Sequence, residues 1–228
     1  MERLIRNLKI TINPKVYVKD PESSDLGKRL VEQGIALIDQ QGFEHFTFKK
    51  LGDLVGSNES SVYRYFENKH KFLLYLSCWY WGWMEYRLVL NTLGASDPED
   101  RLNKALEILT QPVELDMAFA HVDEVALNRI MVNEHAKPFL TKAVDRENKE
   151  GYFEPYKRLV ERFAEMIGEV NGDYPFARSL ASTVLEGSLH QHFLENHLPS
   201  LTNCKQPGSI THFFRGLVTS VLNSSEYV

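Results

Sequence analysis

Apolar residues recur with a helical period from Ser24 onward. Ser24 or Asp25 can cap a first helix, because a short polar side chain there accepts a hydrogen bond from a backbone N–H in the first turn. Gly42 ends the pattern, as glycine does after many helices. The positions that share the apolar face of this helix are Leu30, Gly34, Leu37 and Ile38.

Two short helical segments follow. Thr47 can cap a helix over residues 48–55, and Gly56 marks its end. Asn58 can cap the next helix, residues 59–65, which has barely two turns. The order of elements is therefore helix, glycine turn and second helix.

The rest of the chain is also helical in pattern. Asn68 can cap a long helix that runs to about Thr92, and later turns are marked by glycine and proline. Upstream, the Asn13-Pro14 step predicts a turn, so residues 1–23 are expected to form a flexible arm or a small hairpin. We predict an all-α protein of about nine or ten helices.

Charge divides the chain unevenly. The net charge is −5, with +2 over residues 1–75 and −7 over residues 76–228. We expect three parts: an N-terminal arm (1–23), a small helical domain (24–75) and a larger helical domain. Because only the N-terminal third has a net positive charge, it is the only part of the chain expected to bind an anionic partner.

Composition indicates a folded cytoplasmic protein. Cys78 and Cys204 lie far apart without a CxxC partner, so we expect no disulfide, metal site or cofactor. The start MERLIRNLKI lacks an apolar stretch of secretory length. The longest uncharged run, residues 72–84, is shorter than the roughly 20 residues that cross a membrane.

Caps, glycines and aromatic residues fall in one register between Thr47 and Lys69. Two helices joined by a glycine-bearing turn cross steeply, and the second can enter the major groove of DNA. The residues of the motif are Thr47, Leu51, Gly52, Val55, Gly56, Val62, Tyr63, Tyr65, Phe66 and Lys69. This pattern resembles the DNA-binding domain of the TetR family of bacterial regulators, over about residues 25–76.

The resemblance implies a three-helix helix-turn-helix domain followed by a larger helical domain (76–228) that binds an effector and dimerises. The resemblance also implies that the partner of the helix-turn-helix domain is double-stranded DNA. Tyr63 and Lys69 are expected to contact phosphate groups. The residues expected at the groove are Ser60, Ser61 and Tyr65, and those expected to approach the DNA backbone are Thr47 and Lys49. The alternative for Tyr63 and Tyr65 is that they pack between helices, and one of them could do both.

Two lysines support this interpretation independently. Lys69 and Lys71 lie in the first turn of the long helix, where a positive charge opposes the helix dipole. Such a placement is tolerated where an anion docks at the helix start. The basic arm could add a minor-groove contact, or it could pack or stay disordered.

Glu59 is an acid at the start of the expected recognition helix. It can complement the helix dipole, for about 0.3 to 1 kcal/mol. Alternatively, it can accept a hydrogen bond from a cytosine amino group. The first explanation is favoured.

Two C-terminal segments, about residues 173–196 and 209–222, each carry an apolar stripe. Two such helices from each chain would make a four-helix interface, so we expect a homodimer. An aromatic stripe on the long helix forms either core or one wall of a pocket for a small apolar effector. The candidate ligand-binding residues are Trp79, Trp83, Tyr86, Met117, His121 and Met131.

No catalytic motif of the GxSxG, P-loop, GxGxxG or HExxH type occurs, so no enzyme is expected. The expected function is that of a ligand-responsive repressor that binds a palindromic operator as a dimer. The alternative is a lipid- or isoprenoid-binding protein on the same fold without DNA binding. Glu59 and the weak positive charge give the alternative some weight, whereas Tyr63, Tyr65 and Lys69 argue against it.

Overall fold

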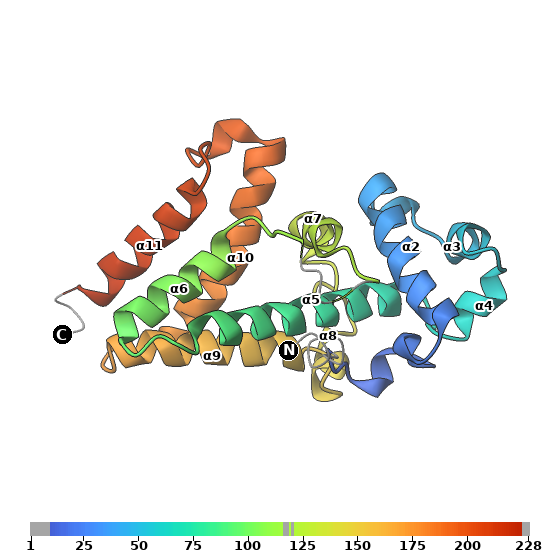
Figure 1. Ribbon diagram of the computed structural model, residues 1–228, viewed down its shortest axis with the longest axis horizontal. Helices are drawn as coiled ribbons and strands as arrows, with labels where there is room; N and C mark the ends of the chain where they lie inside the picture. Colours follow the sequence, from blue (N-terminus) through green and yellow to red (C-terminus); the bar gives the residue numbers. More distant parts are fainter. Residues whose placement is uncertain (1–9, 116–118, 120, 225–228) are drawn as a thin grey trace. The chain divides into compact units, whose positions relative to one another are not determined.

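The computed structural model describes residues 10–115, 119 and 121–224, which contain helices and no strand. The α-helices are α2 (Asp25–Gln41), α3 (Phe48–Leu54), α4 (Glu59–Tyr63), α5 (Lys69–Thr92), α6 (Pro98–Thr110), α7 (Glu124–Glu134), α8 (Val144–Lys149), α9 (Glu154–Val170), α10 (Ala177–His197) and α11 (Ser209–Leu222) (Figure 1). The prediction of an all-α fold is confirmed. Within the described residues, no helix has both the length and the apolar content that a membrane crossing requires.

Side-chain caps begin the first helices where the sequence predicts them. Ser24, Thr47 and Asn58 each accept a hydrogen bond from the backbone N–H three residues later, at 3.2, 3.2 and 3.0 Å. Helix α4 ends two residues earlier than predicted, because the Val62 carbonyl accepts hydrogen bonds from the turn that follows.

The chain divides into two compact units. The first comprises the described part of Met1–Tyr80 with Val113–Pro155, and the second comprises Trp81–Pro112 with Tyr156–Val228. This division differs from the expected boundary at residue 75, because residues 113–155 group with the helix-turn-helix segment and the division falls within α5.

The arm is ordered from Ile10 onward, which corrects the expectation of a flexible arm or hairpin there. It forms two 3₁₀ turns, Pro14–Val16 and Pro21–Ser23, and buries Val16 in the first unit. The Val18 N–H donates to the Tyr65 carbonyl at 2.8 Å. The basic residues Arg3, Arg6 and Lys9 lie outside the described residues.

Phe72 of α5 is the centre of the first unit. Its fully buried ring stacks on Phe46 at a centroid distance of 5.1 Å and meets Phe66 edge-on at 4.8 Å. Gly34 of α2 lets the ring approach, since a Cβ on Gly34 would lie 2.3 Å from Phe72 Cζ. One aromatic ring therefore fixes how α2 and α5 cross.

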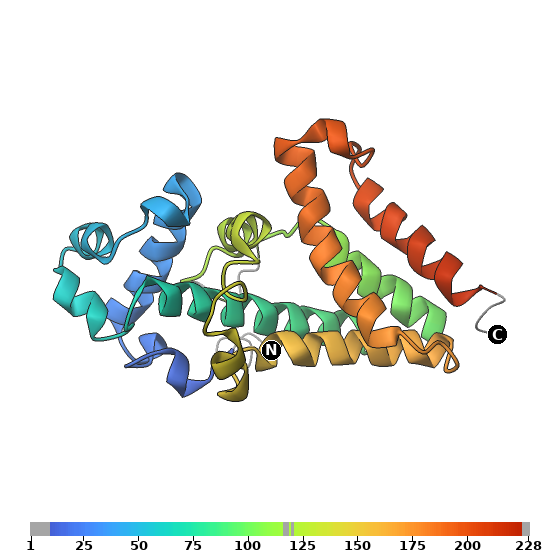
Figure 2. The same ribbon diagram turned by 180° about the vertical axis from the view of Figure 1, so that it is seen from behind.

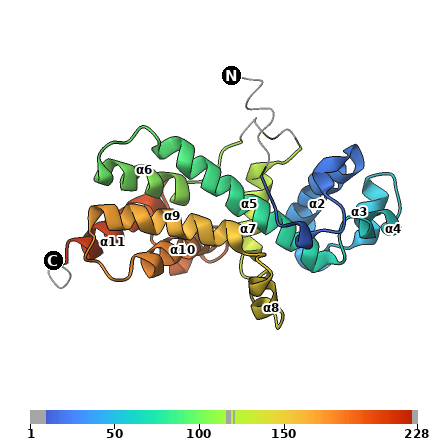
Figure 3. The ribbon, with the colours of Figure 1, turned by 90° about the horizontal axis from the view of Figure 1, so that it is seen from below.

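In the second unit, α6, α10 and α11 pack against one another (Figure 2). Gly187 of α10 faces the Phe214 ring, and a Cβ there would lie 2.9 Å from it. The hydroxyls of Thr110 and Thr211 form a buried hydrogen bond of 2.8 Å between α6 and α11. Helix α9 lies beside the second half of α5 (Figure 3), where Trp81 contacts Tyr156 at 4.8 Å between centroids.

Gly34→Ala is expected to destabilise the protein by about 1 to 3 kcal/mol, because the buried Phe72 ring has no room to move away from the new methyl group. Gly168→Ala in α9 is the matched control. Nothing lies within 4 Å of that Cβ position, so the better helix propensity of alanine should stabilise by up to about 1 kcal/mol. Urea unfolding followed by circular dichroism measures the stability of both variants. Equal changes in the free energy of unfolding would contradict the packing of Phe72 against Gly34.

Candidate DNA-binding surface

Helices α3 and α4 approach each other at Gly52. A Cβ on Gly52 would lie 2.7 Å from the carbonyl carbon of Asn58, the residue that caps α4. The connecting turn uses Gly56, whose φ of 67° favours glycine, and the Ser57 N–H donates to the Gly52 carbonyl at 2.9 Å. Two glycines thus give the short α4 a fixed angle against α3.

Ser61, predicted at the groove, is half-buried and helps to hold the start of α4. Its Oγ donates to Asn58 Oδ1 at 3.2 Å and accepts a hydrogen bond from Ser57 Oγ at 2.9 Å. The hydroxyl of Ser61 is therefore engaged within the turn.

The outward face of α4 is polar. Glu59, Ser60 and Tyr63 are exposed and therefore accessible to a partner. The Tyr63 ring packs edge-on against Phe48 of α3 at 5.0 Å, and its hydroxyl donates to Glu59 Oε1 at 3.4 Å. Glu59 thus contacts a residue one turn away on its own helix.

The remaining residues predicted to contact DNA, Thr47, Lys49 and Lys69, are also exposed. Thr47 and Lys49 lie at the start of α3. Lys69 begins α5, with its ammonium group 4.9 Å from the centre of the Phe43 ring. Glu44, which lies near Lys69, pairs with Lys137, and the hydrogen bond from Lys137 lowers the pKa of the Glu44 carboxyl group.

Lys71 is buried, which corrects its interpretation as an anion contact. Its ammonium group donates to the Lys15 carbonyl at 3.3 Å and lies 3.7 Å from the centre of the Tyr152 ring. Burial lowers the pKa of Lys71. These contacts, rather than a docked anion, account for a lysine in the first turn of α5.

Tyr65 follows the packing alternative and not the groove role, because its side chain is only 4% exposed. Its hydroxyl forms a 2.8 Å hydrogen bond with Ser24 Oγ, which lowers the pKa of Tyr65. The contact ties the segment after α4 to the cap of α2. Tyr65 therefore packs inside the first unit and does not belong to the exposed surface.

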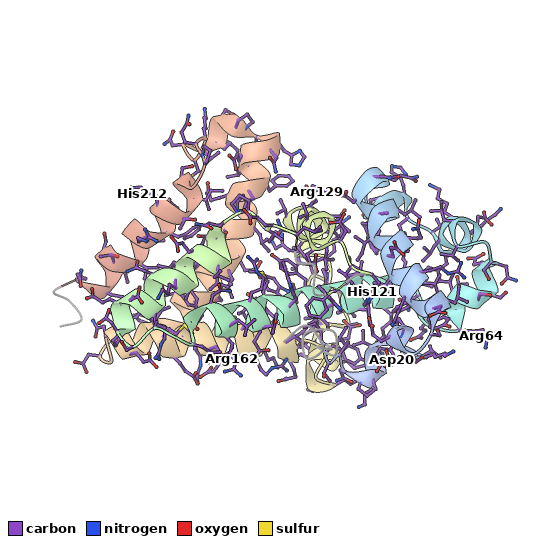
Figure 4. The ribbon with its side chains drawn as sticks, viewed as in Figure 1. Asp20, Arg64, His121, Arg129, Arg162 and His212 are labelled. Carbon is purple, nitrogen blue, oxygen red and sulfur yellow. The ribbon has the colours of Figure 1, made fainter. Side chains whose placement is uncertain are left out.

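Two further exposed cations lie on this surface. Arg64 belongs to the sequence segment expected to form the recognition helix, and it lies directly after α4 (Figure 4). Lys50 of α3 bridges to α2 through Gln41 Oε1 and to the His45 carbonyl, both at 2.9 Å.

The predicted ligand residues are divided between the units. Trp79 and Met131 are buried in the first unit, where His121 Nε2 lies 2.6 Å from Glu22 Oε1 (Figure 4). Trp83 and Tyr86 belong to the second unit. Met117 lies outside the described residues.

Comparisons with known proteins agree with the motif. Residues 30–76 match the family model described as "Bacterial regulatory proteins, tetR family", which confirms the resemblance. A search of curated proteins finds no match.

Two solved structures share the fold. The fatty acid degradation regulator FadR from Bacillus halodurans is 15% identical, with a TM-score of 0.58 over 90% of this chain and 98% of that one. AibR, solved in complex with isovaleryl coenzyme A and operator DNA, is 14% identical, with a TM-score of 0.55 over 85% of this chain and 96% of that one. At these identities the likeness shows a common fold.

Tyr65→Phe is expected to lower the free energy of unfolding by about 1 kcal/mol, because Ser24 loses its buried hydrogen-bond partner. Tyr63→Phe removes an exposed hydroxyl and should change stability by less than about 0.5 kcal/mol. A double-mutant cycle with Ser24→Ala, measured by urea unfolding, isolates the pair. Additive effects of Tyr65→Phe and Ser24→Ala would contradict the contact.

Proposed function

We propose that this chain is a ligand-responsive repressor that binds a palindromic operator as a homodimer. The observation that carries the proposal is the exposed polar face of α4, held at a fixed angle to α3 by Gly52. A short helix held in this way can enter the major groove, where base edges differ in their donors and acceptors.

The exposed residues suggest a division of roles. Ser60 lies in the first turn of α4, at the end of a recognition helix that meets base edges, while Glu59 beside it complements the helix dipole. Lys49, Tyr63 and Lys69 can hydrogen-bond phosphate oxygens, which position a protein on the duplex without reading sequence. Because residues 1–75 have a net charge of only +2, a single surface binds DNA weakly, and high affinity for DNA has to come from two such surfaces acting together.

Helices α10 and α11 are the proposed dimer contact. Leu180, Val184 and Phe214 of the predicted stripes are buried within the chain, so they cannot serve a partner. Phe176 and Phe213 are 52% and 48% exposed and offer apolar area for a second copy. A two-fold pair would present two α4 helices to half-sites about one helical turn, roughly 34 to 36 Å, apart.

The proposed effector is a small molecule with an apolar part. AibR was solved with both an acyl coenzyme A and operator DNA, which supports a similar pairing of ligand and DNA here. An effector needs only to prefer a conformation that binds the operator poorly, and the DNA affinity then falls by the same coupling factor.

Selection of bound sequences from a random DNA pool is expected to yield a two-fold symmetric site. Lys69→Gln should weaken binding to it and reduce the salt slope by about 0.9 for each lost phosphate contact, or roughly 2 per dimer. Lys205→Gln removes an exposed lysine of the second unit and should leave the slope unchanged. Failure to enrich any sequence at low salt would favour a lipid-binding protein without DNA binding.

Glu59→Gln is expected to leave the selected sequence unchanged and to cost about 0.3 to 1 kcal/mol of stability, because the acid complements the dipole of α4. The same random-pool selection, repeated with the variant, measures the preference. A changed base at one position of each half-site would instead assign Glu59 to reading cytosine.

A further inference from the structure

Two arginines of α9 share one buried carboxylate in the second unit. The Glu85 side chain on α5 is 12% exposed, and its carboxylate accepts from Arg158 Nε at 3.0 Å and from Arg162 Nε at 2.7 Å. The arginines are one helical turn apart, so both guanidinium groups project from the same side of α9. Each is held in place through its inner nitrogen.

One arginine would neutralise Glu85, but two leave an excess charge of +1. Among the described residues, the terminal Nη groups of Arg158 and Arg162 make no hydrogen bond. Their side chains are 49% and 48% exposed. Two oriented, half-exposed guanidinium groups therefore have terminal N–H donors available, which is the arrangement that oxyanions prefer.

Arg162 lines a cavity of about 270 Å³ in the same unit. Arg101 of α6 also lines it and is held by both Glu169 oxygens, at 3.0 and 2.8 Å, and by the Ala95 carbonyl. The apolar part of the wall consists of Val89, Leu93 and Met166. The cavity thus combines an apolar surface with positioned polar groups, as ligand sites do.

We propose that Arg158 and Arg162 bind the oxyanion of a small ligand, a phosphate or a carboxylate, whose apolar part lies against the wall of this cavity. The inference rests on the proposed ligand-responsive function and names the chemistry of the effector. Bidentate bonds from each fork to one oxyanion supply the specificity, and the buried Glu85 keeps the forks oriented before the ligand arrives.

Glu165 limits where the anion can lie. It lines the same cavity and has the same sign of charge as the ligand, three residues along α9 from Arg162. The oxyanion is therefore placed on the Arg158 side of Arg162. Glu165→Gln should tighten anion binding severalfold, because it removes a repulsive charge.

Calorimetric titration of the full chain, without DNA, tests the site with hexyl phosphate and with hexanoate. At least one should bind at about millimolar concentration or below, and the tighter of the two identifies the oxyanion as phosphate or carboxylate. The variant Glu85→Gln/Arg158→Gln/Arg162→Gln removes the whole cluster without leaving a buried charge unpaired. It should bind about tenfold more weakly or not at all.

Arg178→Gln is the matched control, because this arginine is exposed in the same unit, pairs with Glu161 and does not line the cavity. It should bind both probes within about twofold of wild type. Arg158→Lys/Arg162→Lys keeps the charge and should still weaken binding, since lysine cannot make the bidentate bonds. Wild-type affinity in the triple variant, or no binding of either probe at about 10 mM, would overturn the inference while leaving the proposal of DNA binding intact.

Discussion

The position of the proposed recognition helix depends on the packing of the Phe72 ring. Helix α4 has five residues and is too short to be stable alone. Its C-terminal side continues into Phe66, which lies against Phe72, and its N-terminal side lies against Gly52 of α3. Phe72 in turn rests on Gly34 of α2. The polar outer face of α4 is therefore oriented by contacts on its inner side, and exposed Tyr63 adds an edge-on contact with Phe48 of α3.

Local chemistry made much of this domain predictable. Caps such as Thr47 and Asn58 act on a backbone group three residues away, so the sequence alone identifies them. The burial of Tyr65 was not predictable in the same way, because its partner Ser24 lies 41 residues earlier. Lys71 likewise owes its burial to Tyr152 and to the Lys15 carbonyl. A helical pattern shows which residues share a face, but not what covers that face.

The ligand site illustrates a different limit. Helical spacing placed Trp79 and Trp83 on one face of α5, yet the division between the compact units falls between them. Net charge was also a poor guide, because the −7 of residues 76–228 is a sum over many pairs. The two arginines that share Glu85 create a local excess of positive charge inside an acidic region. Only three-dimensional contacts reveal such an excess.

Helix α5 carries elements of both proposed activities. Lys69 is its first residue, and its last turns contribute Val89 to the cavity and Glu85 to the arginine pair. Glu85 links this helix to α9 through side chains that a bound oxyanion would also engage. A ligand that draws the arginines toward itself would change the contact between Glu85 of α5 and the arginines of α9. If the ligand is to release DNA, the conformation that it favours must have a lower affinity for the operator.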